Sequence, residues 1–519
     1  MFPIPVMVGR RLLLGAPPGV IGEDALALLR RTGAMGLVLF RSNLTQPAQL
    51  RQHLTWLREC LGRPVVIAID HEGGQVMRHL EGTAPWPGNY ALGRVAEQDV
   101  PQAERWAEQV GWELGQELRA LGIGWNLAPV LDVLGEQPNP GLGGRAFGSD
   151  PEVVTRLGLA MVRGLQQAGI VPCGKHFPGL GWAQVDPHHT LPRLDLSPSQ
   201  LAAHWQPFRA AIEAGLPTVM TTHVLVPALD TENVMTFSQH TIQTHLRGEL
   251  QFTGVCVSDD LQMGAMTDWG TMADMTLKTL QAGHDVALVG AQAEDWQAVL
   301  GRLSEAVDQG ALPELEASLQ RIAHLMSQAD IAQVLPPTQD WQPATLLAAE
   351  IAQAAVRVVR DPQGWLPVKW PVRLYLPDVT PVADWVLFEP CWFAPAQMAD
   401  LLGVPTAEIV MTFLDATRVC TSTREAGDTK AGDDCAADVF TTNVLILYDA
   451  LRYPGQRRVL EELAHQGQPL VVVLVRNPGD VHLVPAGVTV VDAAGFRSPQ
   501  VQQVGRVLRG EPWHFCAGG

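Results

Sequence analysis

The sequence is poor in cysteine, in positive charge and in long apolar runs. Its seven cysteines are scattered, with no Cys-x-x-Cys pair, so neither a disulfide framework nor a structural zinc site is expected and a reducing compartment fits. The formal net charge of -18 argues against nucleic acid as a partner, because binding phosphates requires a basic face. No stretch approaches the roughly 20 apolar residues that span a bilayer, and no signal-peptide pattern opens the chain. We therefore expect a soluble cytoplasmic protein without membrane association.

The chain is long enough for two domains. Its 519 residues are more than a single hydrophobic core usually accommodates. The composition, with 47% hydrophobic and 17% charged residues, is typical of a globular protein. The composition changes after residue 330, where prolines disfavour helix. We predict a (β/α)8 TIM-type catalytic barrel over residues 1–333, a linker over 334–344 and a smaller α/β sandwich domain over 345–519.

The barrel prediction rests on eight short apolar runs that alternate with longer helical stretches. Continuous apolar runs of this length indicate parallel strands that are buried on both faces. Eight of them before residue 290 favour a closed barrel over an open sheet. The runs are residues 6–8, 35–40, 65–69, 123–127, 170–173, 218–220, 254–257 and 285–289.

Polar residues follow most of these runs at the point where each strand would end. In a (β/α)8 barrel the active site lies at the carboxyl ends of the strands, so these side chains should meet at one rim. We therefore predict a functional site there. The residues concerned are Arg41, Asp70, Asp132, Lys175, His176, Thr222, His223, Asp259 and Asp260.

The second domain repeats the alternation on a smaller scale. Strands are expected at residues 372–376, 408–413, 444–448 and 470–475, and helices at 345–359 and 457–465. This region has no G-x-G-x-x-G and no P-loop, so nothing in it indicates nucleotide binding.

The stretch 175–189 gathers ionisable residues in a loop, with one lysine, three histidines and one aspartate. Asp186 and His188 lie two positions apart, so in an extended segment the carboxylate could hydrogen-bond the imidazole and set its tautomer. Such a dyad can give and take a proton near neutral pH. Alternatively, Asp186 and His188 are simply solvated loop side chains. The neighbouring His189 also leaves open which imidazole would exchange the proton.

Other residues of the predicted rim have two interpretations each. Asp259 suits a nucleophile for sugar chemistry, but it or Asp260 could instead cap the following helix. His223 could be functional or simply a packed, hydrogen-bonded histidine. The residues that could hold a ligand are Asp70, Arg78, Arg145, Lys175 and His176, although Arg78 and Arg145 taken singly could be ordinary surface arginines.

Four motifs resemble those of the glycoside hydrolase family 3 β-N-acetylhexosaminidases. One is Lys175-His176-Phe177-Pro178-Gly179-x-Gly181 followed by Asp186-x-His188. The others are 68–76 with Arg78, 128–132 with 145–148, and 254–263, which contains Ser258-Asp259-Asp260. The resemblance covers most of residues 30–290. Two positions depart from the pattern: Leu180 stands where the family usually has a histidine, and Ala146 where a serine is usual.

The resemblance implies a retaining, two-step cleavage of terminal β-linked N-acetylglucosamine from muropeptide fragments, as in cell-wall (peptidoglycan) recycling, or from chitin-type oligosaccharides. It implies Asp259 as nucleophile and His188, paired with Asp186, as general acid/base. The sugar would be held by Asp70, Arg78, Arg145, Lys175 and His176. A small carbohydrate would be the partner, the oligomeric state is left open, and neither a metal nor another cofactor is expected.

Four alternatives remain. A β-glucosidase or a β-glycoside phosphorylase of the same family would share the fold, and a histidine acid/base repels phosphate less than a carboxylate would. A metal-dependent hydrolase would use His176, His188, His189 and Asp259 as ligands, although no H-E-x-x-H motif supports it. The last is a non-catalytic sugar-binding protein.

Overall fold

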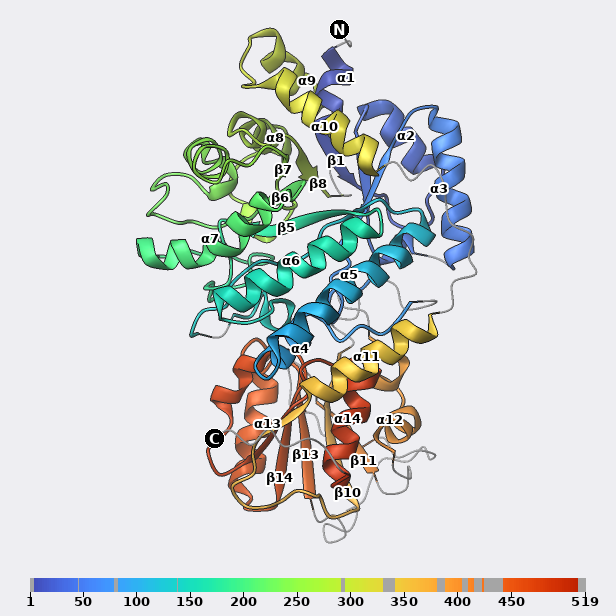
Figure 1. Cartoon of the computed structure of the whole chain (residues 1–519), viewed down its shortest axis with the longest axis vertical. Helices are drawn as coiled ribbons and strands as arrows, with labels where there is room; N and C mark the ends of the chain where they lie inside the picture. Colours follow the sequence, from blue (N-terminus) through green and yellow to red (C-terminus); the bar gives the residue numbers. More distant parts are fainter. Residues whose placement is uncertain are drawn as a thin grey trace.

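The computed structural model describes residues 4–44, 46–78, 83–137, 139–290, 295–329, 341–379, 388–403, 409–414, 422–423 and 442–511. Two sheets organise these residues, one in each half of the chain, and the two halves lie end to end (Figure 1). Among the described residues no helix is both long and apolar enough to cross a membrane.

The first sheet is a parallel eight-stranded barrel, as predicted. Its strand order is β7-β6-β5-β4-β3-β2-β1-β8, and a parallel bridge between Val257 and Val286 joins the two ends. Every strand residue is buried, which explains why the sequence runs are apolar throughout instead of alternating. The strands are β1 (Leu12–Gly15), β2 (Gly36–Leu39), β3 (Val66–Ile69), β4 (Trp125–Asn126), β5 (Val171–Phe177), β6 (Thr218–Thr221), β7 (Val255–Val257) and β8 (Ala287–Val289).

The prediction of the first strand was wrong. Residues 6–8 belong to a helix, α1 (Ile4–Gly9), and the strand is Leu12–Gly15, which pairs with both β2 and β8. A three-residue apolar run does not distinguish a helix from a strand. The fully buried Leu12, Leu13 and Leu14 fill the remaining position in the ring.

Helices surround the barrel, and the pair α5 and α6 shows how the sequence sets them. Asp99 caps α5 by accepting a hydrogen bond from Gln102 N, and Asp150 caps α6 in the same manner. The two helices approach closely because Gly164 lies against α5, where a Cβ would come within 2.0 Å of Glu108 O. The helices are α2 (Glu23–Thr32), α3 (Pro47–Leu61), α4 (Asn89–Ala96), α5 (Val100–Leu121), α6 (Pro151–Gln167), α7 (Pro198–Glu213), a π-helix (His240–Glu249), α8 (Met272–Gln281), α9 (Trp296–Asp308) and α10 (Leu315–Ala329).

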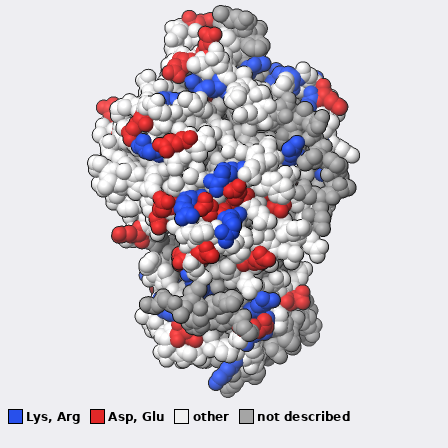
Figure 2. Space-filling view, viewed as in Figure 1, with Lys and Arg blue, Asp and Glu red and all other residues white. Residues whose placement is uncertain are grey.

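The outer surface of α5 and α6 carries acidic and basic side chains side by side (Figure 2). Glu104 on α5 pairs with Arg156 at 2.7 Å and with Arg163 at 3.4 Å, both on α6. These side chains are partly exposed, so each pair contributes little to stability.

The second sheet has seven strands in the order β12-β11-β10-β13-β14-β15-β9, with the two edge strands antiparallel to a parallel centre. Helices α12 and α14 pack on one face and α13 on the other, which makes the predicted sandwich (Figure 1). The strands are β9 (Arg357–Arg360), β10 (Val372–Pro377), β11 (Ile409–Leu414), β12 (Ser422–Thr423), β13 (Thr442–Leu447), β14 (Leu470–Leu474) and β15 (Thr489–Asp492); the helices are α11 (Gln342–Ala355), α12 (Pro395–Leu402), α13 (Pro454–His465) and α14 (Ser498–Arg509).

The junction between the halves differs in detail from the expectation. The helix expected over 345–359 is α11, which ends at Ala355, and the residues after it form the edge strand β9. The apolar face of α11, including Leu347 and Ile351, packs into the core of the barrel half. Residues 334–340 of the expected linker lie outside the described residues, so the domain boundaries remain a prediction.

Candidate active site

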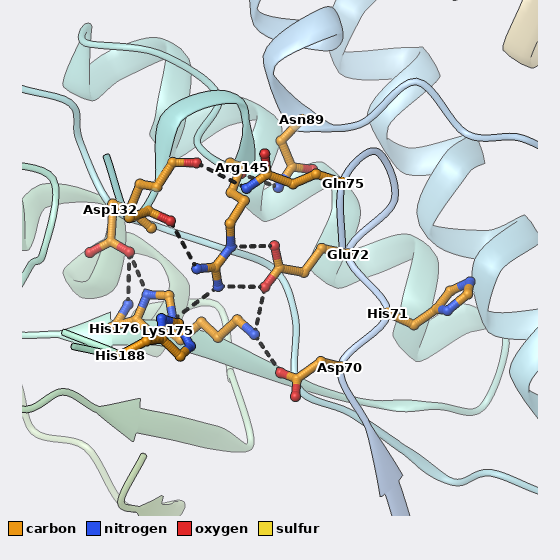
Figure 3. A network of polar contacts seen from close by, with 12 residues as sticks. Asp70, His71, Glu72, Gln75, Asn89, Asp132, Arg145, Lys175, His176 and His188 are labelled. Atoms are coloured by element: carbon orange, nitrogen blue, oxygen red, sulfur yellow. Dashed lines mark hydrogen bonds and ion pairs between the residues drawn. The ribbon is translucent and has the colours of Figure 1, made fainter. Parts of the chain in front are cut away.

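A buried ion-pair network lies at the carboxyl ends of the barrel strands, centred on Glu72 (Figure 3). Arg145 donates from Nη2 to Glu72 Oε1 at 2.8 Å and from Nε to Oε2 at 3.0 Å. Lys175 Nζ lies 2.7 Å from Glu72 Oε1 and 2.7 Å from Asp70 Oδ1. Arg78 adds a looser pair, 3.7 Å from Asp70 Oδ2. The strand ends therefore bring together the charged residues expected to hold a ligand.

The charges of Glu72 and Lys175 are stabilised by their neighbours. Burial alone would raise the pKa of Glu72, but the charges and hydrogen bonds of Arg145 and Lys175 outweigh it and hold that pKa well below its usual range. Burial likewise lowers the pKa of Lys175, and Asp70 and Glu72 more than restore it. Removing one partner would leave an uncompensated charge in the interior, which is costly.

His176 completes the network through Asp132, which follows β4. Its Nδ1 donates to Asp132 Oδ2 at 2.6 Å, and its Nε2 accepts from Arg145 Nη2 at 3.3 Å. These two contacts assign the neutral tautomer with the proton on Nδ1. Asp132 Oδ1 accepts from the backbone N of Leu180 at 2.6 Å, so this position contributes its backbone while its side chain is buried among apolar residues.

A local irregularity in β5 places two consecutive side chains in the same network. The pairing of β5 with β6 shifts register between Lys175 and Phe177. In a regular strand successive side chains point to opposite faces, whereas a register shift re-aims one of them. Lys175 and His176 can therefore both face the site.

The dyad expected from the sequence is present. Asp186 Oδ1 accepts hydrogen bonds from His188 Nδ1 at 2.7 Å and from His188 N at 3.0 Å. Burial raises the pKa of Asp186, but the contacts with His188 and the charge of Arg452 reverse this and hold it well below its usual range. Asp186 is thus an ionised acceptor, and the His188 side chain, which it holds through Nδ1, is 53% exposed.

The loop that carries the dyad is joined to the segment after β7. Gly264 N donates to His188 O at 3.2 Å, and Ala265 N donates to Pro187 O at 3.1 Å. The same segment carries Asp259, two residues after the end of the strand. These backbone contacts connect the loop of the candidate acid/base to the loop of the candidate nucleophile.

The structure separates the two adjacent aspartates. Asp260 Oδ1 accepts from Gln262 N and from Gly290 N, both at 2.9 Å, and burial raises its pKa to about 6. Among the described residues, the Asp259 carboxylate accepts one hydrogen bond, from Asp260 N at 2.8 Å. Asp260 is thus the residue engaged by the loop backbone, and Asp259 has the carboxylate that is available to a ligand.

His223 is a buried, hydrogen-bonded histidine. Its Nδ1 lies 2.7 Å from Thr236 Oγ1 and its Nε2 lies 2.9 Å from the carbonyl oxygen of Asp260. Burial lowers its pKa, the charge of Asp259 opposes this, and His188 adds to it. The two hydrogen bonds of His223 therefore connect Thr236 to the backbone of the segment that carries Asp259 and Asp260.

Sequence reasoning missed the role of Glu72. It lies two residues after Asp70, and side chains two apart in an extended segment share a face, which was the available signal. His71, between them, points away from the network in Figure 3. No group of three or more His, Cys, Asp or Glu side chains with the arrangement of a metal site occurs within the described part of the chain.

Comparisons with known proteins identify the family and the relatives of this chain. The family model described as the glycosyl hydrolase family 3 N-terminal domain matches residues 14–325. A β-hexosaminidase of Chromobacterium violaceum is 37% identical over 332 residues, which cover 64% of this chain and 89% of that protein.

Two solved structures are also similar. A glycoside hydrolase family 3 β-N-acetylglucosaminidase from Paenibacillus sp. str. FPU-7 has a TM-score of 0.86 at 29% identity and covers 98% of this chain and 97% of its own. NagZ from Neisseria gonorrhoeae, in complex with N-trifluoroacetyl-D-glucosamine, has a TM-score of 0.58 at 30% identity and covers 66% of this chain and 97% of its own. The likeness to the first therefore extends over both sheets.

Proposed function

This chain belongs to glycoside hydrolase family 3 as a β-hexosaminidase, and we propose that it is a retaining exo-β-N-acetylglucosaminidase. Asp259 is the proposed nucleophile and His188, oriented by Asp186, the proposed general acid/base. The observation that carries the proposal is the Asp186–His188 hydrogen bond on a loop that pairs with the segment carrying Asp259.

The proposed reaction has two steps. In the first, an Asp259 carboxylate oxygen attacks the anomeric carbon while the glycosidic bond breaks, and the leaving oxygen takes a proton from His188 Nε2. In the second, His188 Nε2 removes a proton from water, whose oxygen displaces Asp259 from the anomeric carbon. Asp186 remains ionised throughout and accepts the Nδ1–H hydrogen bond, which stabilises the imidazolium.

The network around Glu72 is the proposed sugar-binding wall. Its members are held in place by ion pairs before any ligand arrives, so little side-chain entropy is lost on binding. Hydroxyl groups can both donate and accept, which suits a wall of alternating carboxylates and cations. The proposed sugar-holding residues are Asp70, Arg78, Arg145, Lys175 and His176.

The proposed substrates are muropeptide fragments of cell-wall recycling in the cytoplasm, or chitin-type oligosaccharides. The N-acetylglucosamine part is supported by the Paenibacillus structure, which is described as a β-N-acetylglucosaminidase, and by the N-acetylglucosamine analogue bound in the Neisseria structure. Comparing kcat/KM on a muropeptide fragment and on a chitin disaccharide would separate the two substrate classes.

The proposal is tested with an activated aryl β-N-acetylglucosaminide and with an alkyl one. Asp259→Ala should abolish turnover of both. His188→Ala should lower kcat/KM, which reports only the first step, by about 10²–10⁴-fold on the alkyl substrate and much less on the aryl one, because an activated leaving group needs little protonation. Turnover by Asp259→Ala, or equal losses on both substrates for His188→Ala, would contradict the assigned roles.

The alternatives are separated by the same assays. Faster cleavage of β-glucosides would indicate a β-glucosidase, and a rate that depends on phosphate would indicate a phosphorylase. Loss of activity on chelation would indicate a metal-dependent hydrolase. Sugar binding without turnover would leave a non-catalytic binding protein.

A further inference from the structure

The second domain contacts the loops of the candidate active site directly. Arg497, fully buried at the start of α14, donates from Nε to the carbonyl oxygen of Gly74 at 2.8 Å, just beyond the Glu72 loop. The carbonyl oxygen of Arg476 accepts from Gly144 N at 3.1 Å, beside Arg145. Both contacts end on backbone atoms of the barrel.

A third contact ends on the proposed catalytic dyad itself. Arg452 donates from Nη1 to Asp186 Oδ2 at 3.1 Å, and its Nη2 donates to Nε2 of His189. Because His188 uses Oδ1, the two oxygens of Asp186 are divided between the acid/base and an arginine from the other domain. The guanidinium therefore contacts Asp186 and His189, on either side of His188 in the sequence. No hydrogen bond joins it to His188 itself.

Arg452 is held firmly at its own end. Its backbone N donates to Asp449 O at 3.1 Å. The two preceding residues, Ala450 and Leu451, donate their backbone N–H groups to the buried carboxyl group of Asp480 at 2.8 and 3.1 Å. The position from which the guanidinium reaches across the interface is therefore set by hydrogen bonds within the second domain.

We propose that Arg452 is a positioning residue for the acid/base step, through which the second domain holds the Asp186–His188 dyad in its working orientation. The inference rests on the proposed role of His188. A carboxylate held on both oxygens cannot rotate, so the direction of its hydrogen bond to His188 Nδ1 is set. That direction orients the ring and hence Nε2, the atom that meets the glycosidic oxygen.

A purely structural role would give a different result. If Arg452 only joined the two domains, its loss would resemble the loss of any interdomain arginine of similar exposure. Arg357 is such a residue: it donates to Glu97 Oε2 at 2.8 Å and to Arg94 O at 2.6 Å, and none of its hydrogen bonds reaches the dyad. The side chains of Arg452 and Arg357 are 28% and 21% exposed, so they form a matched pair.

The experiment compares Arg452→Ala, Arg452→Lys and Arg357→Ala in the full chain, on the aryl and the alkyl β-N-acetylglucosaminides. Arg452→Ala should lower kcat/KM, which reports only the first step, by about tenfold or more on the alkyl substrate, a part of what a general acid contributes, with little change on the aryl one. Arg452→Lys keeps the charge but not the two-pronged contact and should recover part of the loss. Arg357→Ala should behave as the unsubstituted enzyme on both substrates.

The outcomes separate the inference from the function on which it rests. Equal losses on both substrates in Arg452→Ala, or a profile that matches Arg357→Ala, would overturn the positioning role while the profile of His188→Ala stands. If His188→Ala itself lacked leaving-group dependence, the proposed acid/base would fail first. Thermal unfolding of all variants checks that Arg452→Ala is folded, and Arg452→Lys supplies the kinetic test if it is not.

Discussion

The two halves of the candidate site are built by opposite means. The half around Glu72 is buried and closed on itself: the Glu72 side chain is 1% exposed and its partners Arg145 and Lys175 come from the same barrel. The half around His188 is open to solvent and takes one of its anchors, Arg452, from the other domain. The proposed binding wall gains from a closed set of charges, whereas the proposed proton donor needs a fixed orientation together with access from solvent. The same chemistry of charge pairs thus serves different purposes according to burial.

The largest effect should come from breaking the buried ion pairs of Glu72. Glu72→Gln removes the charge that compensates Arg145 and Lys175, so we expect a loss of about 3–5 kcal/mol in the free energy of unfolding, together with a higher KM. Urea denaturation and steady-state kinetics measure both. Glu104→Gln is the matched control, because its arginine partners are partly exposed and its loss should not exceed about 1 kcal/mol. Equal losses in the two variants would remove the distinction between buried and exposed pairs.

A smaller effect is expected at Asp480, which binds the backbone just before Arg452: the free energy of unfolding should depend on pH. Burial and the charge of Asp449 raise the pKa of Asp480 to about 7, whereas an unfolded aspartate titrates near about 4. Between these values the folded protein binds the extra proton, so stability should fall as pH rises from about 4 to 7. Asp480→Asn should reduce this fall by a few kcal/mol at most, since one pKa unit is worth about 1.4 kcal/mol.

The free energy of unfolding, measured at several pH values, tests this prediction. The exposed Asp195→Asn serves as the control for the substitution itself. An unchanged pH dependence in Asp480→Asn would mean that the segment carrying Arg452 is not braced by an aspartate that is protonated in the folded state.

The smallest effect concerns the position between the halves. Leu180→His restores the residue usual in the family, but the Leu180 side chain is buried in an apolar cluster and only its backbone N bonds Asp132. Burying an imidazole there should cost about 1–3 kcal/mol and leave kcat nearly unchanged. Thermal unfolding and kcat on the aryl substrate measure the two quantities. A large change in kcat without loss of stability would show that the side chain takes part in the site.

Much of the barrel and its rim could be predicted from the sequence, because both follow from local patterns. Continuous apolar runs identify parallel strands, and parallel strands bring their carboxyl ends to one rim, so Asp70, Lys175 and Asp259 were expected to meet. The first strand was misplaced because a short apolar run fits a helix equally well. The register shift that aims His176 into the site has no local signal.

The sequence alone determined which residues could carry the chemistry and on which rim they would lie, through strand periodicity and the Asp186-x-His188 spacing. Only the tertiary structure decided which charges pair. Glu72 takes Arg145 and Lys175, Asp260 is bound by backbone while Asp259 is left for a ligand, and Arg452 reaches Asp186 across 266 residues. The physical reason is that strand patterns depend on near neighbours, whereas the choice of an ion-pair partner depends on loop conformation, burial and the docking of a second domain.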